Sequence, residues 1–355
     1  MDNKTSIYYD GTKLLSLKDI NGEPPEIFIC TTNRTAGKTT YFGRALVRKF
    51  LKTGAKFCLV YRFKTELKGC EDKFFKDIGS LFFPGFTMGS KRRDEGNYYE
   101  LFLECPAWDE SKSCGYAICL NKADAIKKLS HLLSDVEWML FDEFQSETNS
   151  YCADEVEKLL SVHTSMARGQ GKAVRYLPII MLSNAVSLLN PYFTALGISA
   201  RLTPEVRFMR GDGWVLEQGY NENAGTAQKE SGFNRAFAKE KYVEYAATNV
   251  YLNDNTAFVE KLTGDSRYLC TLKYKGSEYA IREYADAGII YCSDKADSSY
   301  PYKITVTKDD HDVNYVMLKR NDLFLQQLRW YFERGCFRFK DLRAKEAVLA
   351  ALAYN

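Results

Sequence analysis

The chain has 355 residues, of which 45% are hydrophobic, 14% aromatic and 27% charged, with a formal net charge of +3. This composition excludes a largely disordered protein, and the length predicts two domains. No apolar run reaches the roughly 18 residues of a membrane span, and the N-terminal residues lack the apolar core of a signal peptide. Ten cysteines without a C-x-x-C pair argue against zinc and disulfides. We therefore expect a cytosolic protein with reduced thiols and no membrane partner.

The first part of the chain alternates apolar, strand-like runs with helical patterns. Buried strands alternating with helices predict a parallel α/β sheet, and we expect this domain to occupy residues 1–200. The predicted strands lie at residues 26–30, 56–63, 99–105, 116–121, 137–142 and 176–182, and the predicted helices at 39–52, 123–133 and 153–167.

The pattern changes after residue 200. Residues 211–213 and 221–232 are rich in Gly, Asn, Ser and charge, which predicts a linker or small subdomain over residues 201–250. A second, α+β domain is expected over residues 251–355. Its predicted strands lie at 257–262, 267–274, 277–284, 288–293 and 302–307, and its helices near 319–333 and 341–353.

A phosphate-binding loop is predicted between the first strand and the first helix. Residues 32–39 read TNRTAGKT and match G-x-x-x-x-G-K-[ST], except that Thr32 replaces the first glycine. Such a loop offers backbone N–H groups and a lysine to phosphates, and a hydroxyl to Mg²⁺. We therefore expect ATP and Mg²⁺ as cofactors. The predicted nucleotide contacts are Thr32, Asn33, Arg34, Thr35, Ala36, Gly37, Lys38, Thr39 and Thr40.

Two carboxylates close the predicted strand 137–142. Asp142 is expected to hold Mg²⁺ together with Thr39, and Glu143 to orient and deprotonate an attacking water. An exposed acidic pair at a strand end is a common alternative. The second carboxylate favours hydrolysis, because a kinase of small molecules does not need it.

Two further polar residues are predicted to complete the site. Asn184 follows the next strand, and the carboxyl ends of parallel strands share one edge, so it is expected to sense the γ-phosphate. Arg168 ends the preceding helix, before a Gly-Gln-Gly stretch. It is either an arginine finger or a helix-end charge favoured by the helix dipole, and spacing does not decide between them.

Positive charge is concentrated between Arg34 and Lys68, where ten basic residues face the single acid Glu66, a net charge of +9. This predicts contact with a polyanion, the alternative being a solvated helix face. Arg62 and Lys64 would share one face of an extended strand, and they are the predicted nucleic-acid contacts.

Several of these segments resemble the DNA packaging (encapsidation) ATPase of phi29-type bacteriophages, an ASCE P-loop family related to the large terminases. The most specific is residues 182–193 (LSNAVSLLNPYF); weaker similarity extends over nearly the whole chain. The other matching segments are residues 141–144 (FDEF), residues 57–67 (FCLVYRFKTEL) and the loop with Arg34, Gly37 and Lys38.

The resemblance implies a homo-oligomeric ring, a pentamer, that pumps double-stranded DNA into a phage procapsid. It implies a packaging RNA and the portal connector as partners. The location would be the cytoplasm of the infected bacterium, transiently at the procapsid portal vertex and not in the mature virion. It implies an ASCE ATPase domain, a lid and a C-terminal RNase H-like domain that is a vestigial nuclease. Trans-acting residues of the family fall on Arg168 and near Lys127 or Lys128.

Two departures from the family pattern concern the loop and the residues after it. Thr32 and Thr35 stand where the family has glycines, and residues 71–120 align poorly. The alternative functions are a large terminase with an active nuclease, a P-loop helicase, and a nucleotide-gated nucleic-acid-binding structural module. Glu143 argues against the module. Residues 267–274 hold no acid for a metal on the first strand, which argues against the nuclease.

Overall fold

The computed structural model describes residues 9–148, 150–168, 171, 173–199, 201–202, 206–247, 254, 258–319 and 321–353. The chain forms two compact units, the first made of residues 1–196 and 202–253 and the second of residues 197–201 and 254–355. Within the described residues, none of the helices has the length and hydrophobicity that crossing a lipid bilayer requires.

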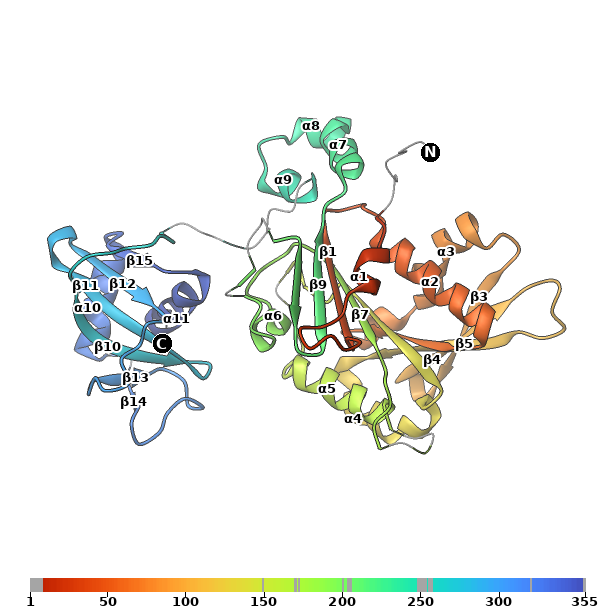
Figure 1. Cartoon of the computed structure of the whole chain (residues 1–355), viewed down its shortest axis with the longest axis horizontal. Helices are drawn as coiled ribbons and strands as arrows, with labels where there is room; N and C mark the ends of the chain where they lie inside the picture. Colours follow the sequence, from red (N-terminus) through yellow and green to blue (C-terminus); the bar gives the residue numbers. More distant parts are fainter. Residues whose placement is uncertain are drawn as a thin grey trace. The chain divides into compact units, whose positions relative to one another are not determined.

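A large mixed sheet forms the centre of the first unit (Figure 1). In the described part of the unit it has nine strands, and the five pairings among β5, β2, β6, β7, β1 and β9 are parallel. Antiparallel pairs extend it at both edges. In spatial order the strands are β3 (Thr87–Arg93), β4 (Tyr98–Glu104), β5 (Lys112–Cys119), β2 (Lys56–Tyr61), β6 (Val136–Asp142), β7 (Ile179–Asn184), β1 (Ile27–Thr32), β9 (Trp214–Gly219) and β8 (Phe208–Gly211).

The strand order confirms the predicted fold class. Strand β7 lies between β1, which leads into the phosphate-binding loop, and β6, which ends in Asp142. This additional strand between the loop strand and the acidic strand is the arrangement expected of an ASCE P-loop domain. It places Asn184, the last residue of β7, between the two motifs.

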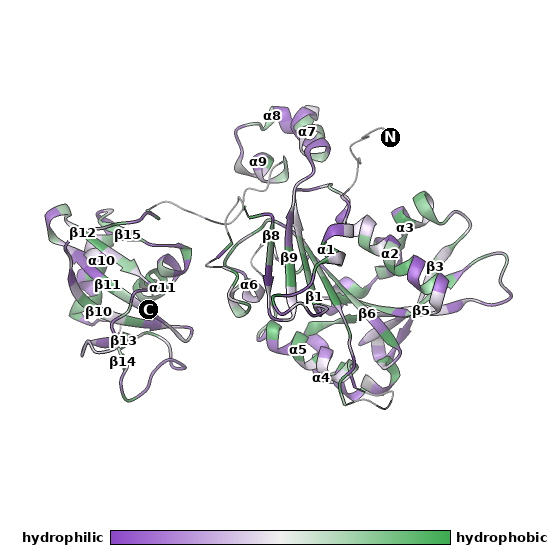
Figure 2. Cartoon of the chain, in the orientation of Figure 1, coloured by the Kyte–Doolittle hydropathy of each residue, from purple (hydrophilic) through white to green (hydrophobic). Residues whose placement is uncertain are grey.

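Helices pack on the sheet through side chains that alternate along its strands. Phe28, Leu59, Leu140 and Ile180 belong to one buried cluster with α2 and α3, whereas the residues next to them, such as Ile29, are buried outside that cluster. Figure 2 shows the strands as largely hydrophobic. The helices are α1 (Thr12–Ser16), α2 (Lys38–Thr53), α3 (Cys70–Phe82), α4 (Ala123–Lys128), α5 (Glu155–Met166) and α6 (Pro191–Ala195), with 3₁₀ turns η1 (Lys64–Leu67), η2 (Asp94–Gly96), η3 (Leu120–Lys122) and η4 (Ser130–Leu133).

The expected lid over residues 201–250 is smaller than predicted. Residues 208–219 form β8 and β9, and β9 pairs in parallel with β1, so they belong to the main sheet. The glycines at 211 and 213 mark the tight turn between these strands, and the sequence pattern misread that turn as a linker. The remaining residues, 222–247, form α7 (Glu222–Glu230), α8 (Gly232–Ala236) and α9 (Lys241–Ala247), which we call the lid.

The second unit is α+β, as predicted. A buried cluster joins its sheet to two helices, with Leu325, Leu328, Phe337, Phe339 and Val348 at its centre. β10, β11 and β12 are antiparallel, and β13 and β14 continue in parallel beyond β10, as an RNase H-like domain requires. The elements are β10 (Arg267–Tyr274), β11 (Ser277–Tyr284), η5 (Ala285–Ala287), β12 (Ile289–Ser293), β13 (Lys303–Thr305), β14 (Val316–Met317), α10 (Leu323–Glu333), β15 (Phe337–Phe339) and α11 (Leu342–Ala353).

Candidate nucleotide site

The carboxyl ends of β1, β7 and β6 bring the predicted motifs to one edge of the sheet. Thr32, Asn184 and Asp142 are the last residues of these three strands. Helix α2 begins at Lys38 and leaves its first N–H groups without partners inside the helix, which suits a phosphate. The predicted nucleotide and metal motifs therefore meet in one place.

The two threonines at glycine positions of the loop adopt different backbones. Thr32 is a buried strand residue, and its hydroxyl donates to the carbonyl of Asn33 at 2.8 Å. Thr35 has a φ of 57°, in the left-handed region, where a side chain costs about 1–2 kcal/mol. Its hydroxyl donates to the Arg34 carbonyl at 2.7 Å and accepts from Gln228 Nε2 at 3.1 Å. Of these two threonines, only Thr35 therefore has a strained backbone.

Two short bonds join the loop to the neighbouring strands. Lys38 Nζ donates to Asn184 Oδ1 at 2.7 Å, and Thr39 Oγ1 donates to Asp142 Oδ2 at 2.8 Å. Burial lowers the pKa of Lys38, while the nearby Asp142 opposes this shift. Burial likewise raises the pKa of Asp142, against the effect of Lys38. The hydroxyl and the carboxylate are hard oxygen ligands of the kind that Mg²⁺ takes, so these residues fit the predicted metal.

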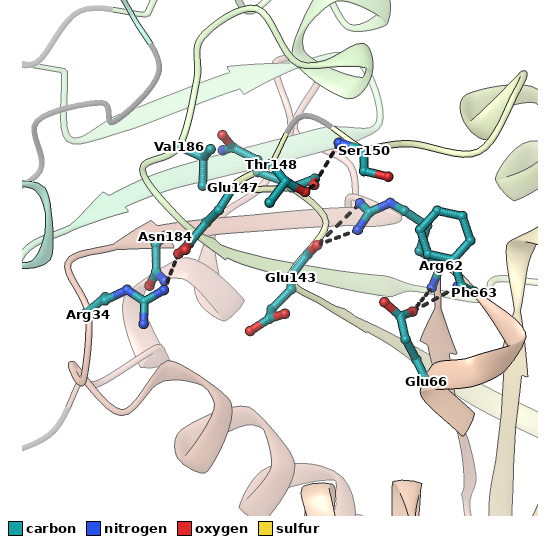
Figure 3. A pocket seen from close by; sticks show the side chains of 12 residues that line it. Arg34, Arg62, Phe63, Glu66, Glu143, Glu147, Thr148, Ser150, Asn184 and Val186 are labelled. Carbon is teal, nitrogen blue, oxygen red and sulfur yellow. Dashed lines mark hydrogen bonds and ion pairs between the residues drawn. The ribbon is translucent and has the colours of Figure 1, made fainter. Parts of the chain in front are cut away.

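Glu143 follows β6 in a left-handed turn, with a φ of 57°. Its N–H donates to Asp142 Oδ1 at 3.0 Å. The side chain lines a pocket of about 330 Å³, together with Arg34, Glu147 and Asn184 (Figure 3). Burial raises the pKa of Glu143, and the negative charge of Asp142 adds to the shift. A carboxylate with a raised pKa beside an open pocket suits a general base.

The loop is tied to the lid by contacts that sequence reasoning missed. Arg34 forms an ion pair with Glu147, and its guanidinium lies 5.3 Å from the ring of Tyr242 and 5.9 Å from that of Tyr245. The Tyr245 hydroxyl also donates to Glu147, at 2.7 Å. Glu147 lies in a loop and the tyrosines lie about two hundred residues beyond Arg34, so no local pattern marks them.

A second set of loop contacts involves residues predicted to bind nucleotide. Asn33 and Asn221 exchange bonds of 3.1 and 3.0 Å, and the Ala36 carbonyl accepts from the N–H of Tyr9 at 2.7 Å. Thr40 is half-buried in the first turn of α2. Asn33 is thus hydrogen-bonded to Asn221, the N-terminal cap of the lid helix α7.

The predicted trans-acting residues lie away from this pocket's lining. Arg168 is exposed and follows Ala167, the C-terminal cap of α5. Lys127, on α4, forms an ion pair with Asp124 at 2.8 Å, and Lys128 is exposed. Arg168 is therefore accessible to another molecule, as a trans-acting role requires.

The pairing of Arg62 and Lys64 on one strand face is wrong. Strand β2 ends at Tyr61, and Lys64 begins the 3₁₀ turn η1. Arg62 is 6% exposed and forms an ion pair with Glu155 at 2.8 Å, so it is not available to DNA. Lys64 remains partly exposed, and its amine donates to the Glu95 carbonyl at 3.1 Å. Arg62 is thus bonded to buried acceptors, namely the Glu155 carboxylate and the Phe144 carbonyl.

A phosphate-binding loop, an acidic pair at the end of β6 and an additional strand between them define an ASCE P-loop protein. Comparison with known families then identifies the particular group. The family model of the podovirus DNA encapsidation protein (Gp16) matches residues 1–352, and the chain belongs to this family. The resemblance inferred from the sequence is thereby confirmed, and the function of the chain lies in the packaging of phage DNA.

Individual relatives agree with this assignment over most of their length. The DNA packaging protein of Bacillus phage phi29 is 26% identical over 342 residues, covering 95% of this chain and 94% of that protein. The DNA packaging protein of Bacillus phage B103 is 25% identical over 317 residues, covering 87% and 90%. The bacteriophage Phi-29 viral genome packaging motor assembly contains a chain of the same fold, with a TM-score of 0.69 at 24% identity and 98% coverage of both chains.

Proposed function

We propose that this chain hydrolyses ATP with Mg²⁺ and that hydrolysis drives double-stranded DNA into a procapsid. The observation that carries the proposal is the convergence of Lys38, Thr39, Asp142, Glu143 and Asn184 at one sheet edge, with the 2.7 and 2.8 Å bonds described above. Family membership supports the link to DNA packaging.

Each residue has a role that its surroundings support. Lys38 and the first N–H groups of α2 bind the phosphates, and Asn184, which already holds the Lys38 amine, orients that amine. Thr39 and Asp142 would hold Mg²⁺, which would supply positive charge against the phosphates. Glu143 accepts a proton from the attacking water, because its carboxylate lines the pocket next to Asp142. Two other carboxylates line the pocket, but Glu147 is bonded to Arg34 and Glu66 accepts backbone N–H groups.

The motor itself is proposed from the relatives. Proteins of this family named for DNA packaging, and the solved phi29 motor assembly, support action at a procapsid in the infected bacterium. A ring of five subunits, a packaging RNA and the portal connector remain parts of the proposal. So does the trans action of Arg168, with Lys127 or Lys128 as a second contributor.

The second unit is proposed to position partners rather than to cut DNA. Its first strand, β10, contains no acid. Asp294 forms an ion pair with Lys340, and Asp310 accepts the N–H groups of Lys275 and Gly276 at 2.7 and 2.8 Å. Asp310 therefore stabilises the turn between β10 and β11, and Asp294 pairs with a lysine just after β15. Metal-dependent cleavage of linear DNA by the full chain with Mg²⁺ or Mn²⁺ would contradict this part of the proposal.

Two substitutions test the nucleotide site. Lys38→Ala is expected to lose ATP binding, whereas Glu143→Gln is expected to bind ATP and to lose roughly 10²- to 10⁴-fold in turnover. ATP affinity and turnover are measured separately, first for the protein alone, then with double-stranded DNA, and then with procapsids and RNA. Strong stimulation under the last condition supports a packaging motor. Near-normal turnover of either variant contradicts the site.

A further inference from the structure

Arg62 is a buried cation next to the catalytic turn. It follows the last residue of β2, the strand that pairs with β6. The residue is 6% exposed. Burial of an unpaired charge costs several kcal/mol, so a buried arginine persists only where acceptors surround it. The acceptors of Arg62 indicate what it does.

The guanidinium contacts the backbone of the residue that carries the catalytic carboxylate. Arg62 Nη1 and Nη2 lie 3.3 and 3.4 Å from the Glu143 carbonyl oxygen, and Nη2 donates to the Phe144 carbonyl at 2.8 Å. In Figure 3 the Glu143 side chain extends away from the guanidinium. From the other side, the Phe144 N–H donates to the Leu182 carbonyl at 3.1 Å. Arg62, just after β2, and Leu182, on β7, therefore hold the left-handed turn at Glu143 from the two sides of β6.

A second buried charge fixes the guanidinium. Arg62 Nε donates to Glu155 Oε2 at 2.8 Å, and Glu155 is 3% exposed. The other oxygen of Glu155 accepts the Tyr192 hydroxyl at 2.8 Å, and the ring of Tyr151 lies 4.9 Å from the guanidinium. A planar fork that donates in several directions at once is a property of arginine and not of lysine. The contacts of Arg62 therefore require the planar guanidinium, which lysine lacks.

We propose that Arg62 is a positioning residue for ATP hydrolysis, which holds the backbone of residues 143–144 so that the Glu143 carboxylate points into the pocket. The inference rests on the proposed function. Glu155 is the first residue of α5, and Arg168 follows the other end of this helix. The bonds of Arg62 therefore connect the backbone at Glu143 to helix α5, the helix that Arg168 follows.

The test separates positioning from stability. Arg62→Lys retains the charge that pairs with Glu155 but loses the fork. ATP affinity should stay within about twofold and kcat should fall about 100-fold, the size of effect that a misplacement of about 1 Å produces. Lys56→Met is the matched control, because Lys56 lies on the same strand and pairs with Asp135 at 2.7 Å, away from Glu143. It should lower the melting temperature without changing kcat.

A double variant shows whether Arg62 acts through Glu143. Arg62→Lys combined with Glu143→Gln should turn over as slowly as Glu143→Gln alone, because the positioned carboxylate is already gone. If Arg62→Lys does not fold, Glu155→Gln serves instead, since its amide oxygen still accepts from Arg62; kcat should then fall about tenfold at unchanged ATP affinity.

Two results would overturn the inference. Wild-type kcat in Arg62→Lys with a lowered melting temperature, or multiplicative losses in the double variant, would make the ion pair structural while the proposed function stands. Normal turnover of Glu143→Gln would overturn the inference and the proposed function together.

Discussion

The two units of the chain bury their polar side chains differently. Among the described residues of the first unit, buried charged side chains include Lys38, Arg62, Glu155 and Glu217. In the second unit the described buried polar residues are Thr271, Ser293, Thr305 and Asp310, and Asp310 serves a turn. Buried charges lower stability unless they are paired, so they persist mainly where function needs them. The contrast agrees with the position of the candidate nucleotide site in the first unit.

The largest expected effect concerns Arg168, whose exposed position at the end of α5 fits a contact with a neighbouring subunit. Arg168→Ala should leave ATP binding by one subunit intact and reduce hydrolysis by assembled rings roughly 10³- to 10⁵-fold. Mixing it with Glu143→Gln should restore some turnover, because some interfaces then pair an intact Arg168 with an intact Glu143. If mixed rings form without any recovery, and Arg168→Ala alone hydrolyses normally, the residue is only a helix-end charge.

A core substitution in the second unit should lower stability and leave the nucleotide site intact. Leu325 is fully buried on α10. Leu325→Ala should lower the free energy of unfolding of that unit by about 2–5 kcal/mol, because it removes packed methyl groups and leaves a cavity. Denaturant unfolding measures the loss, and ATP affinity should not change. A weakened ATP affinity would show that the nucleotide site depends on the second unit.

The pH dependence of hydrolysis should report on the first unit alone. Burial and Asp142 raise the pKa of Glu143 above its ordinary value. A protonated Glu143 cannot accept the proton of the attacking water, so kcat should fall about tenfold per pH unit below this raised pKa. The acidic limb should therefore lie at a higher pH than for an ordinary glutamate, in a profile of kcat against pH. An acidic limb at the ordinary value would assign the proton transfer to another group.

The smallest effect is expected for DNA binding. Lys64→Ala should weaken binding equally for all sequences and reduce the slope of log affinity against log salt by about 1, as one lost phosphate contact does. Lys308, exposed in the second unit, is the matched control, and Lys308→Ala should leave the slope unchanged. Equal effects of the two substitutions would show that the DNA path is not confined to the first unit.

Part of the candidate site could be predicted because its signals are local. Lys38 and Thr39 begin a helix directly after a strand, and Asp142 ends an apolar strand, so spacing and hydrophobic pattern identify them. The glycines at 211 and 213 misled the prediction, since a turn between two sheet strands and a linker share the same composition.

The alternation of strands and helices, the phosphate-binding loop and the acidic pair each depend on residues close together in the chain, so the sequence predicts them. Three other features depend on contacts between residues far apart in the chain. They are the burial of Arg62 against Glu155, the contacts of Arg34 with Glu147 and Tyr245, and the pairing of β9 with β1. A charged side chain looks the same in sequence whether it meets DNA or a buried carboxylate. The difference lies in the desolvation of the charge and in the partners that compensate it, and residues far apart in the chain supply both.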